Sequence, residues 1–238
     1  MRIALQPAFV LHHRPYRETS LLVDLLTQDH GRITVVARGV RTERSKNRAL
    51  IQPFTPLLVS WQSRTELGTL TAVEANAVPV QLRGDCLLGA FYLNELLMRV
   101  LHKHDPHPEL YAIYHKTLLE LQGQTLEQKT LRIFEKRLLD EIGYGLHLEC
   151  SIRDRTAFSA EKYYYFYPEQ GFQLCEDPEK AQAGTLFSGK CLLALAAEVL
   201  EDPALLREAK RIMRMALAPL LGSQPLHSRK LFIEVETS

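Results

Sequence analysis

The first 80 residues divide into five short runs of strand-favouring residues, and turn signals separate the runs. Each run is rich in valine, leucine, isoleucine or threonine. They cover residues 8–12, 21–26, 33–37, 57–61 and 67–77. Between them stand Arg14-Pro15, Asp29-His30-Gly31, the two prolines of residues 53–56, and Gly68. Five strands in so short a segment predict a small closed barrel, because closure removes the exposed edges of an open sheet.

The commonest closed barrel of five strands is the oligonucleotide-binding (OB) type, so we predict an OB-type β-barrel over residues 1–80. After Pro79 the apolar residues follow a helical period. We expect helices over 86–101 and 109–121, and a third that begins with a Thr125–Gln128 capping box and ends at 143–145. Three consecutive helices with short turns predict a helical bundle.

Residues 146–184 interrupt the helical pattern with a small insert. The aromatic run 163–167, a turn at 168–171 and the run 172–175 predict a β-hairpin. Two more helices are expected over 188–201 and 203–217, with Asp202 as N-cap and Pro203 as the first helical residue. The prediction is therefore an α+β chain with a barrel at 1–80 and a helical domain at 81–238, interrupted by the insert.

Positive charge is concentrated at the N-terminal end of a nearly neutral chain. The 238 residues include 29 basic and 28 acidic ones. Residues 1–80 hold ten basic and six acidic residues, which leaves 19 and 22 for the rest. From Gly31 to Arg64 seven basic residues stand against one acid, Glu43. A basic face beside a small β-barrel favours a polyanion such as nucleic acid as the partner.

Two basic stretches are the candidate DNA-binding surfaces. A flexible loop would bring several cations to a phosphate chain, and each neutralised phosphate releases counterions. The first stretch holds Arg32, Arg38, Arg41, Arg44, Lys46 and Arg48; the second, on one face of the last helix, holds Arg207, Lys210, Arg211 and Arg214. The alternative for the loop is an ordinary solvated segment; the barrel context favours binding.

Aromatic residues are candidates for stacking on bases, the second part of single-strand recognition. Tyr16, Phe54 and Trp61 are such candidates in the barrel, although we favour core positions for them. Tyr163, Tyr165 and Tyr167 alternate along one predicted strand and share a face. This tyrosine ladder could stack bases, but cross-strand packing is the commoner use.

Two features of the sequence imitate catalytic or metal sites. Residues 184–191 match a phosphate-binding P-loop except that Cys191 replaces the Ser or Thr, and the preceding segment is polar rather than an apolar strand. We favour a turn with Ser188 near a helix start. His102, His104, Asp105 and His107 straddle a helix end and favour a solvated terminus over a metal site. We expect no catalytic residue, metal or cofactor.

The remaining composition predicts a cytoplasmic protein. Cys86, Cys150, Cys175 and Cys191 are widely spaced and favour reduced thiols. The apolar runs, such as 192–200, are too short to span a bilayer, and the N-terminus has no signal-peptide pattern.

Taken in order, several segments of the chain resemble the bacterial RecO family of recombination mediators. Each segment is weak alone, but their order and spacing are specific. They are residues 8–12 with 14–15 and 18–21, 31–32 with 37–41, 52–57, 92–97, 134–135, 143–145, 209–211 with 214–217, and 225–226 with 228–229.

The resemblance implies an N-terminal OB barrel, a helical domain and a small insert. It implies binding of single- and double-stranded DNA, annealing of complementary strands, and work with RecR, and often RecF, to load RecA onto strands coated by single-stranded DNA-binding protein (SSB). It also implies a nucleoid-associated protein without nucleotide or catalytic residues. Many members carry zinc on two Cys-x-x-Cys pairs in the insert; here Cys150 and Cys175 lack such partners, so we expect no zinc.

The resemblance further implies that the acidic C-terminal tail of SSB docks on the helical domain. On the third predicted helix, cations next to apolar residues suit an acidic peptide that ends in a hydrophobic residue, although spacing alone favours a partly exposed helix with ordinary charge. We assign this role to Arg132, Phe134 and Lys136, with Arg132 at a position that matches the family. Two alternatives stay open: a nucleotide-hydrolysing repair protein that uses residues 184–191, and an RNA-binding OB protein.

Overall fold

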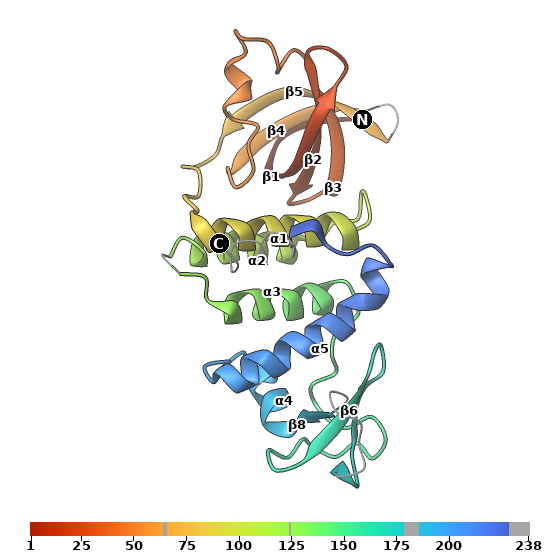
Figure 1. Ribbon diagram of the computed structural model, residues 1–238. Helices are drawn as coiled ribbons and strands as arrows, with labels where there is room; N and C mark the ends of the chain where they lie inside the picture. The colour runs from red at the N-terminus through yellow and green to blue at the C-terminus, as the bar shows by residue number, and fades with distance from the viewer. Residues whose placement is uncertain (64–65, 124, 179–185, 229–238) are drawn as a thin grey trace. The chain divides into compact units, whose positions relative to one another are not determined.

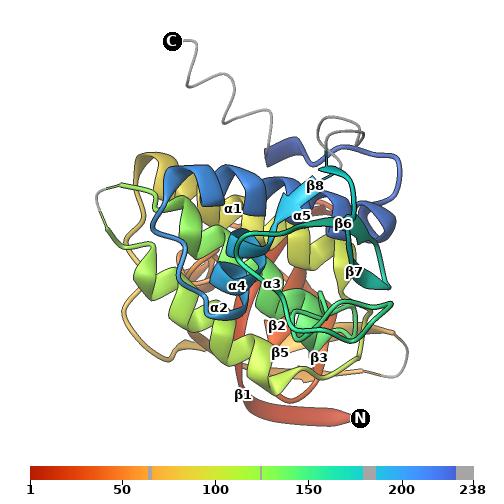
Figure 2. The ribbon, with the colours of Figure 1, turned by 90° about the horizontal axis from the view of Figure 1, so that it is seen from below.

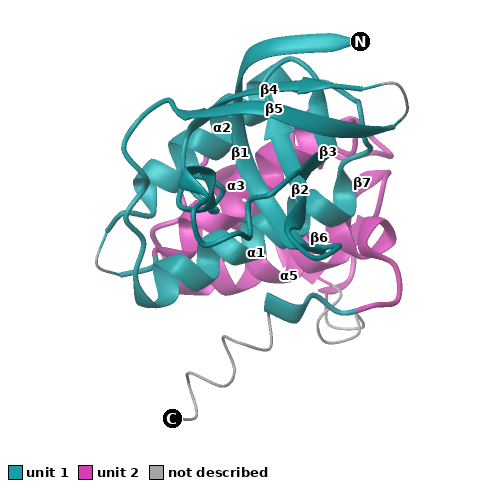
Figure 3. Cartoon of the chain, turned by 90° about the horizontal axis from the view of Figure 1, so that it is seen from above, with its two compact units in different colours: residues 1–126, 225–238 teal, residues 127–224 magenta. Residues whose placement is uncertain are grey.

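The computed structural model describes residues 1–63, 66–123, 125–178 and 186–228 (Figure 1, Figure 2). The chain divides into two compact units (Figure 3). Unit 1 comprises residues 1–126 and 225–238, and unit 2 comprises residues 127–224. The predicted domain limits at residue 80 and around 146–184 stay predictions. None of the described helices is both long enough and apolar enough to cross a membrane.

Unit 1 contains the predicted five-stranded barrel (Figure 1). Its strands are β1 (Arg2–Tyr16), β2 (Ser20–Thr27), β3 (Gly31–Ala37), β4 (Leu57–Gln62) and β5 (Leu67–Ala75). They follow the order β1-β2-β3-β5-β4, and β1 closes the barrel by pairing with β4. All pairs are antiparallel except β3 with β5. The OB-type barrel is therefore confirmed.

Strand β1 is three times as long as the five-residue run predicted for it, with 15 residues. It pairs with β2 along its second half and with β4 along its first half. Register shifts between Ile3 and Gln6, and between Val10 and His12, bend the strand so that it reaches both neighbours. Gln6-Pro7 before the predicted run and His13-Arg14-Pro15 after it interrupt the apolar pattern, so only the central part was visible in the sequence. The turn expected at Arg14-Pro15 lies within β1.

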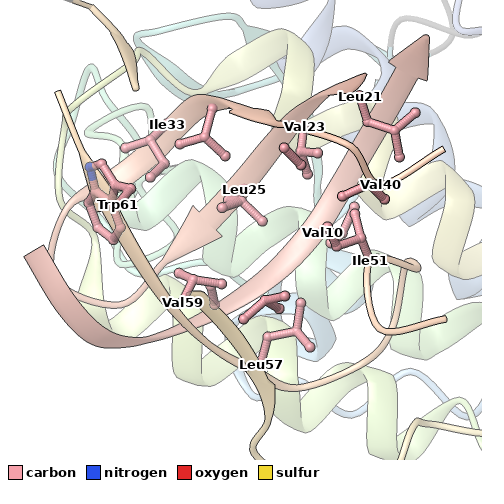
Figure 4. Packing of buried hydrophobic residues seen from close by; sticks show 14 residues of the cluster. Val10, Leu21, Val23, Leu25, Ile33, Val40, Ile51, Leu57, Val59 and Trp61 are labelled. Atoms are coloured by element: carbon pink, nitrogen blue, oxygen red, sulfur yellow. The ribbon is translucent and has the colours of Figure 1, made fainter. Parts of the chain in front are cut away.

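The barrel core is formed by the inward-facing side chains of all five strands (Figure 4). Along β2, Leu21, Val23 and Leu25 point into this core. The alternate residues of β2 are buried as well, although they lie outside the core. A strand buried on both faces must be covered by another layer, and in unit 1 two helices supply it.

Helices α1 (Gly84–Val100) and α2 (Pro108–Glu120) pack on the outside of the barrel. Phe9 of β1 contacts the rings of Tyr111 and Tyr114, with centroids 5.4 and 5.2 Å away. The Asn94 amide donates to the carbonyl of Leu11 at 2.9 Å and accepts from the buried Tyr114 hydroxyl. These contacts place α1 and α2 with the barrel, which differs from the three-helix bundle predicted.

Unit 2 combines three helices with a small sheet. It consists of α3 (Gln128–Glu141), β6 (Tyr163–Tyr167), β7 (Gly171–Leu174), β8 (Leu186–Ser188), α4 (Gly189–Ala196) and α5 (Pro203–Leu221). Helix α5 packs against α3 and α4. The predicted hairpin of β6 and β7 is confirmed, but β8 adds a third strand beside β6. Three residues are too short a run to give a strand signal.

Helix boundaries in unit 2 confirm one predicted cap and contradict two other predictions. Asp202 caps α5, because its carboxylate accepts from the amide of Ala204 at 2.8 Å. The capping box at Thr125 is wrong, since the residue that precedes α3 is Glu127. Helix α4 ends at Ala196 rather than near 201, and Glu198 two residues later has the left-handed φ of 57°.

Gly31, at the start of β3, packs closely against the segment after α1. Its φ is +63°, and a Cβ there would lie 1.9 Å from the carbonyl oxygen of Asp105. Gly39 has a similar φ of +67° but open space around it. Both positions favour glycine because of φ, but only Gly31 also needs the missing Cβ for packing.

We expect Gly31→Ala to destabilise the chain more than Gly39→Ala. The control substitution carries the left-handed backbone penalty alone, about 1–2 kcal/mol, whereas Gly31→Ala must also displace the backbone at Asp105. Urea unfolding of both variants measures the difference. Equal losses in the free energy of unfolding would contradict this packing role.

Candidate nucleic-acid interface

The basic loop, which we define as residues 38–52 between β3 and β4, is anchored in the barrel rather than flexible as predicted. Val40 and Ile51 are 2% and 1% exposed and belong to the barrel core. The Arg41 amide donates to the carbonyl of Thr19 at 2.9 Å. A short 3₁₀ helix, η1 (Lys46–Arg48), adds local order. The loop therefore holds its cations in a defined arrangement.

The loop carries five of the six cations predicted for the first DNA-binding surface. Arg38, Arg41, Arg44, Lys46 and Arg48 are all exposed. Arg41 also has a structural contact, because its guanidinium donates to the carbonyls of Arg17 and Glu18 at 3.2 Å each. It thereby fixes the turn between β1 and β2. The five cations predicted to share one surface are therefore exposed on one continuous loop of the barrel.

A groove of about 780 Å³ lies beside the first residues of this loop. Three segments line it: the β1–β2 turn, the end of β3 with Arg38 and Gly39, and residues 67–69 of β5. The Arg17 guanidinium lies 5.3 Å from the centre of the Tyr16 ring within this lining. A cation beside a partly exposed aromatic ring is a suitable arrangement for a nucleotide. Glu18 also lines the groove, so its charge is mixed.

The sequence pattern did not indicate Arg17 as a binding residue, because the predicted DNA-binding surfaces were clusters of cations. Arg14 is the one other arginine or lysine close to it in sequence, and Glu18 follows it directly, so Arg17 forms no dense basic cluster and only the tight turn after Pro15 hinted at it. Tyr16 is half-buried at the groove, which differs from the core position we favoured. The core positions favoured for Trp61 and Phe54 are confirmed, since they are 3% and 5% exposed.

Arg32 is set apart from the other predicted DNA-binding cations. Its guanidinium donates to the carbonyl of Met98 on α1 at 2.6 Å. Burial lowers the pKa of Arg32, and the nearby charge of Asp24 acts in the opposite direction. The side chain therefore joins β3 to α1, and the structure does not bring it to the basic loop.

The second predicted surface lies on α5 in unit 2. Arg207, Lys210, Arg211 and Arg214 are exposed, whereas Ala209, Ile212 and Met213 on the other face are buried. The predicted separation of faces is therefore confirmed. The Arg211 guanidinium donates to the carbonyl of Leu186 at 2.8 Å and lies 4.9 Å from the centre of the Phe187 ring. This contact ties the cationic face of α5 to the edge strand β8.

The three residues predicted to bind an acidic tail do not share one face of α3. Residues two apart on a helix point in nearly opposite directions, so Phe134 faces away from Arg132 and Lys136. Phe134 is 1% exposed, and Arg132 is buried in an ion pair with Glu135 at 2.9 Å. Lys136 instead binds Asp140 at 3.1 Å and Glu198 at 3.2 Å.

Glu198 joins two cations of α3, Lys136 and Arg137, in one ion-pair cluster. The Arg137 Nε donates to both carboxylate oxygens at 3.1 Å, and a second guanidinium nitrogen donates as well. Burial alone would raise the pKa of Glu198, but the hydrogen bonds from Arg137 and Lys136 outweigh it and lower the pKa. Glu198 has a left-handed backbone in the turn after α4, and its carboxylate there binds both cations.

The P-loop look-alike is occupied by an acidic side chain. Gly184 and Thr185 lie outside the described residues, and residues 186–191 form β8 and the start of α4. Ser188 caps α4 as predicted, accepting from the Cys191 amide at 3.1 Å. Its amide and hydroxyl donate to the carboxylate of Glu208. Burial raises the pKa of the Cys191 thiol to about 12, so the thiol stays protonated at neutral pH and is a poor substitute for a magnesium ligand.

The histidine cluster after α1 has a packing role in unit 1. His107 pairs with Asp105 at 3.3 Å, and the His104 amide donates to the carbonyl of Arg32 at 2.9 Å. Within the part of the chain that the structure describes, no group of three His, Cys, Asp or Glu residues is placed to hold a metal ion. All four cysteines are free thiols.

We expect Arg32→Ala to lower the stability of the chain, while Arg44→Ala leaves it unchanged. The first substitution leaves the Met98 carbonyl without a charged donor, at a cost of about 1.5–3 kcal/mol. Arg44 is exposed on the basic loop. Thermal unfolding of both variants tests the distinction, which fails if the two midpoints shift alike.

Comparison with known proteins identifies relatives along the whole chain. The family model described as "Recombination protein O N terminal" matches residues 1–78, and "Recombination protein O C terminal" matches residues 82–230. A DNA repair protein RecO of Coxiella burnetii is 47% identical over 230 residues, which covers 97% of this chain and 98% of the relative.

Two further relatives have the same name. The DNA repair protein RecO of Nitrosococcus oceani is 46% identical over 99% of this chain and 95% of its own length. The DNA repair protein RecO of Haemophilus influenzae is 43% identical, with 98% of each chain covered. The two family models together match nearly all of the chain, and the named relatives align with it over almost their full length. The chain therefore belongs to the RecO family of DNA repair proteins.

Proposed function

We propose that the protein is a non-enzymatic recombination mediator at the nucleoid that anneals complementary DNA strands and helps to load RecA onto SSB-coated single strands. RecR, and in some settings RecF, would be its partners in that step. The observation that carries the proposal is the anchored basic loop beside the groove of the OB barrel. Family membership supports a role in DNA repair.

The electrostatic argument explains how such a protein would anneal DNA without catalytic residues. Two single strands repel each other, and a bound protein lowers that repulsion by neutralising phosphates and releasing counterions. The basic loop belongs to unit 1 and the exposed cations of α5 belong to unit 2. Two surfaces on one chain would hold two strands and raise their local concentration.

We also propose that the acidic C-terminal tail of SSB docks near Lys136 on α3. The Lys136 ammonium and the Arg137 guanidinium already hold a carboxylate, that of Glu198, so the chemistry of the site suits an acidic peptide. Leu193 and Val199 nearby in sequence are 42% and 58% exposed and suit a hydrophobic end. Arg132 and Phe134 are buried, so they would stabilise α3 rather than contact the peptide.

We expect Arg44→Ala with Arg48→Ala to weaken binding of single-stranded DNA and to slow annealing. Loss of two phosphate contacts would lower the salt slope of binding by about 1.4, at roughly 0.7 per contact on single strands. Arg41 is left intact because it also fixes the β1–β2 turn. Fluorescence anisotropy against salt gives the slope, and annealing of SSB-coated oligonucleotides gives the rate.

The matched control is Arg83→Ala with Lys116→Ala, which removes the same charge from exposed sites near the start of α1 and on α2. It should leave both the slope and the rate near those of the parent chain. If the loop variant and the control behave alike, the loop assignment is wrong. Competition with RNA of the same sequence tests the RNA-binding alternative.

We expect Glu198→Gln to strengthen binding of an acidic peptide that ends in a hydrophobic residue. The substitution weakens the internal competitor for Lys136 and Arg137, whereas Lys136→Ala should weaken binding. The control is Glu201→Gln, because Glu201 pairs with Lys129 rather than with this cluster. Calorimetric titration with the peptide measures the affinity of each variant. If Glu198→Gln and Lys136→Ala both bind the peptide as the parent chain does, the tail docks elsewhere.

A further inference from the structure

Another groove, of about 880 Å³, lies on unit 1 where the barrel meets α1, and we call it the α1 groove. Four apolar side chains line it, those of Leu11, Pro53, Phe91 and Met98, and Phe91 is 40% exposed. The volume is in the range typical of ligand pockets, about 300–1,000 Å³. The α1 groove shares no lining residue with the groove beside the basic loop, so the proposed function leaves it without a role.

The α1 groove borders an open edge of strand β1. On the side away from β2, strand β4 pairs with only the first half of β1. Beyond that half, Pro53 bridges to Val10, and the Asn94 amide binds the Leu11 carbonyl. Pro53 and Asn94 both line the groove. Among the described strands, none covers this side of β1 at residues 12–16, so an added segment of chain would protect an exposed edge there.

Two cations of the α1 groove are exposed. Arg14 and Lys103 line it, and no described acid forms an ion pair with either side chain. Arg32, the third cation of the lining, instead donates to the Met98 carbonyl. Glu66 is the acid nearest to this pair outside the lining, because it lines an adjoining cavity of about 280 Å³ together with Arg14 and Lys103.

The two carboxylates of the lining already have partners. The buried Asp24 accepts from the Thr34 hydroxyl at 2.7 Å, and its second oxygen lies 4.0 Å from the His12 ring. Glu95 pairs with Arg99 at 3.6 Å. The exposed cations next to apolar side chains therefore set the chemistry of the groove, which suits a segment that carries both acids and bulky apolar residues.

Glu95 also fixes residues 225–228 of unit 1 at the groove. Its carboxylate accepts from the amides of His227 and Ser228 at 2.8 Å each, and from the Ser228 hydroxyl at 2.7 Å. Burial alone would raise the pKa of Glu95, but these hydrogen bonds outweigh it and lower the pKa. Leu226 is buried beside this contact in sequence, and Ser228 lines the groove. The last described residue of the chain is therefore held at the α1 groove.

The residues that follow Ser228 have the chemistry that the groove suits. Residues 229–238 lie outside the described residues, and their sequence begins with two cations. Residues 231–233 are Leu-Phe-Ile, and Glu234 and Glu236 follow them. Three to eight residues span at most about 10–28 Å, so this segment reaches the groove from Ser228. Because the segment is tethered at the groove, its effective concentration there is on the order of millimolar, which favours it over a separate peptide of the same chemistry.

We propose that residues 231–236 of this chain dock in the α1 groove, with the apolar side chains of 231–233 against Phe91 and Met98 and the two carboxylates toward Arg14 and Lys103. This inference does not depend on the proposed function. Docking covers apolar surface and the open edge of β1, both of which favour aggregation when they are exposed. An acidic peptide of another protein would enter the groove only by displacing this segment.

The test places the photoreactive residue p-benzoylphenylalanine at Phe232 in the full chain. After irradiation at low protein concentration, mass spectrometry of the digested chain maps the cross-links. We expect cross-links within one chain to residues 11–14, 52–53 or 91–98. The same photoreactive residue at Leu5, which is exposed in the first half of β1, is the control and should give none to 52–53 or 91–98. Cross-links between two chains would assign the groove to a second copy and overturn the inference, and so would cross-links from Phe232 to other segments only.

A charge exchange tests the docked orientation in the same full chain. Arg14→Glu with Lys103→Glu should lower the yield of the groove cross-links about fourfold, at roughly twofold per exposed ion pair. Adding Glu234→Lys with Glu236→Lys should restore the yield. Both cations are exposed, so the thermal unfolding midpoint should stay near that of the parent chain. A yield that the first exchange leaves constant, or that the second fails to restore, overturns the inference, while DNA binding by the basic loop is measured separately and decides the proposed function.

Discussion

The closure of the barrel by β1 is the constraint on which the rest of unit 1 depends. One strand of 15 residues pairs with β2 and with β4, and it does so only because two register shifts bend it. Its outer face carries Phe9 and the Leu11 carbonyl, which bind the helices. Its inner face shares the core with Val40 and Ile51, the anchors of the basic loop. Core packing and cation placement are therefore coupled through one strand.

That coupling explains how a nearly neutral chain would bind a polyanion. The excess charge is small, but the cations of the basic loop are fixed at both ends by buried aliphatic residues. Because the loop is already ordered in the folded chain, binding DNA does not carry the entropic cost of ordering a mobile loop. Arg41 illustrates the cost, because it contributes to order at the β1–β2 turn and has fewer donors left for phosphate.

The sequence predicted those features that depend on local pattern. The alternation in β2 and β3, the Asp202–Pro203 start of α5 and the two faces of α5 follow from neighbouring residues. The features that it missed depend on contacts between distant residues. The contact of Arg32 with Met98, the pairing of Lys136 with Glu198, and β8 beside β6 join segments more than 20 residues apart. Spacing within one helix should nevertheless have excluded a common face for Arg132, Phe134 and Lys136.

Two carboxylates of unit 2 pair with donors of the kind that bind external anions. The Glu198 carboxylate pairs with Lys136 and Arg137 of α3. The Glu208 carboxylate accepts hydrogen bonds from the amide and hydroxyl of Ser188 at the start of α4. An internal carboxylate satisfies buried donors without a ligand, so the apo chain pays no penalty for unpaired groups. The two differ in setting, because Glu198 follows a short helix in a left-handed turn, whereas Glu208 lies within α5. A residue in a turn is displaced at lower cost than one in a helix, so the Lys136 site is the one of the two that an acidic partner would open.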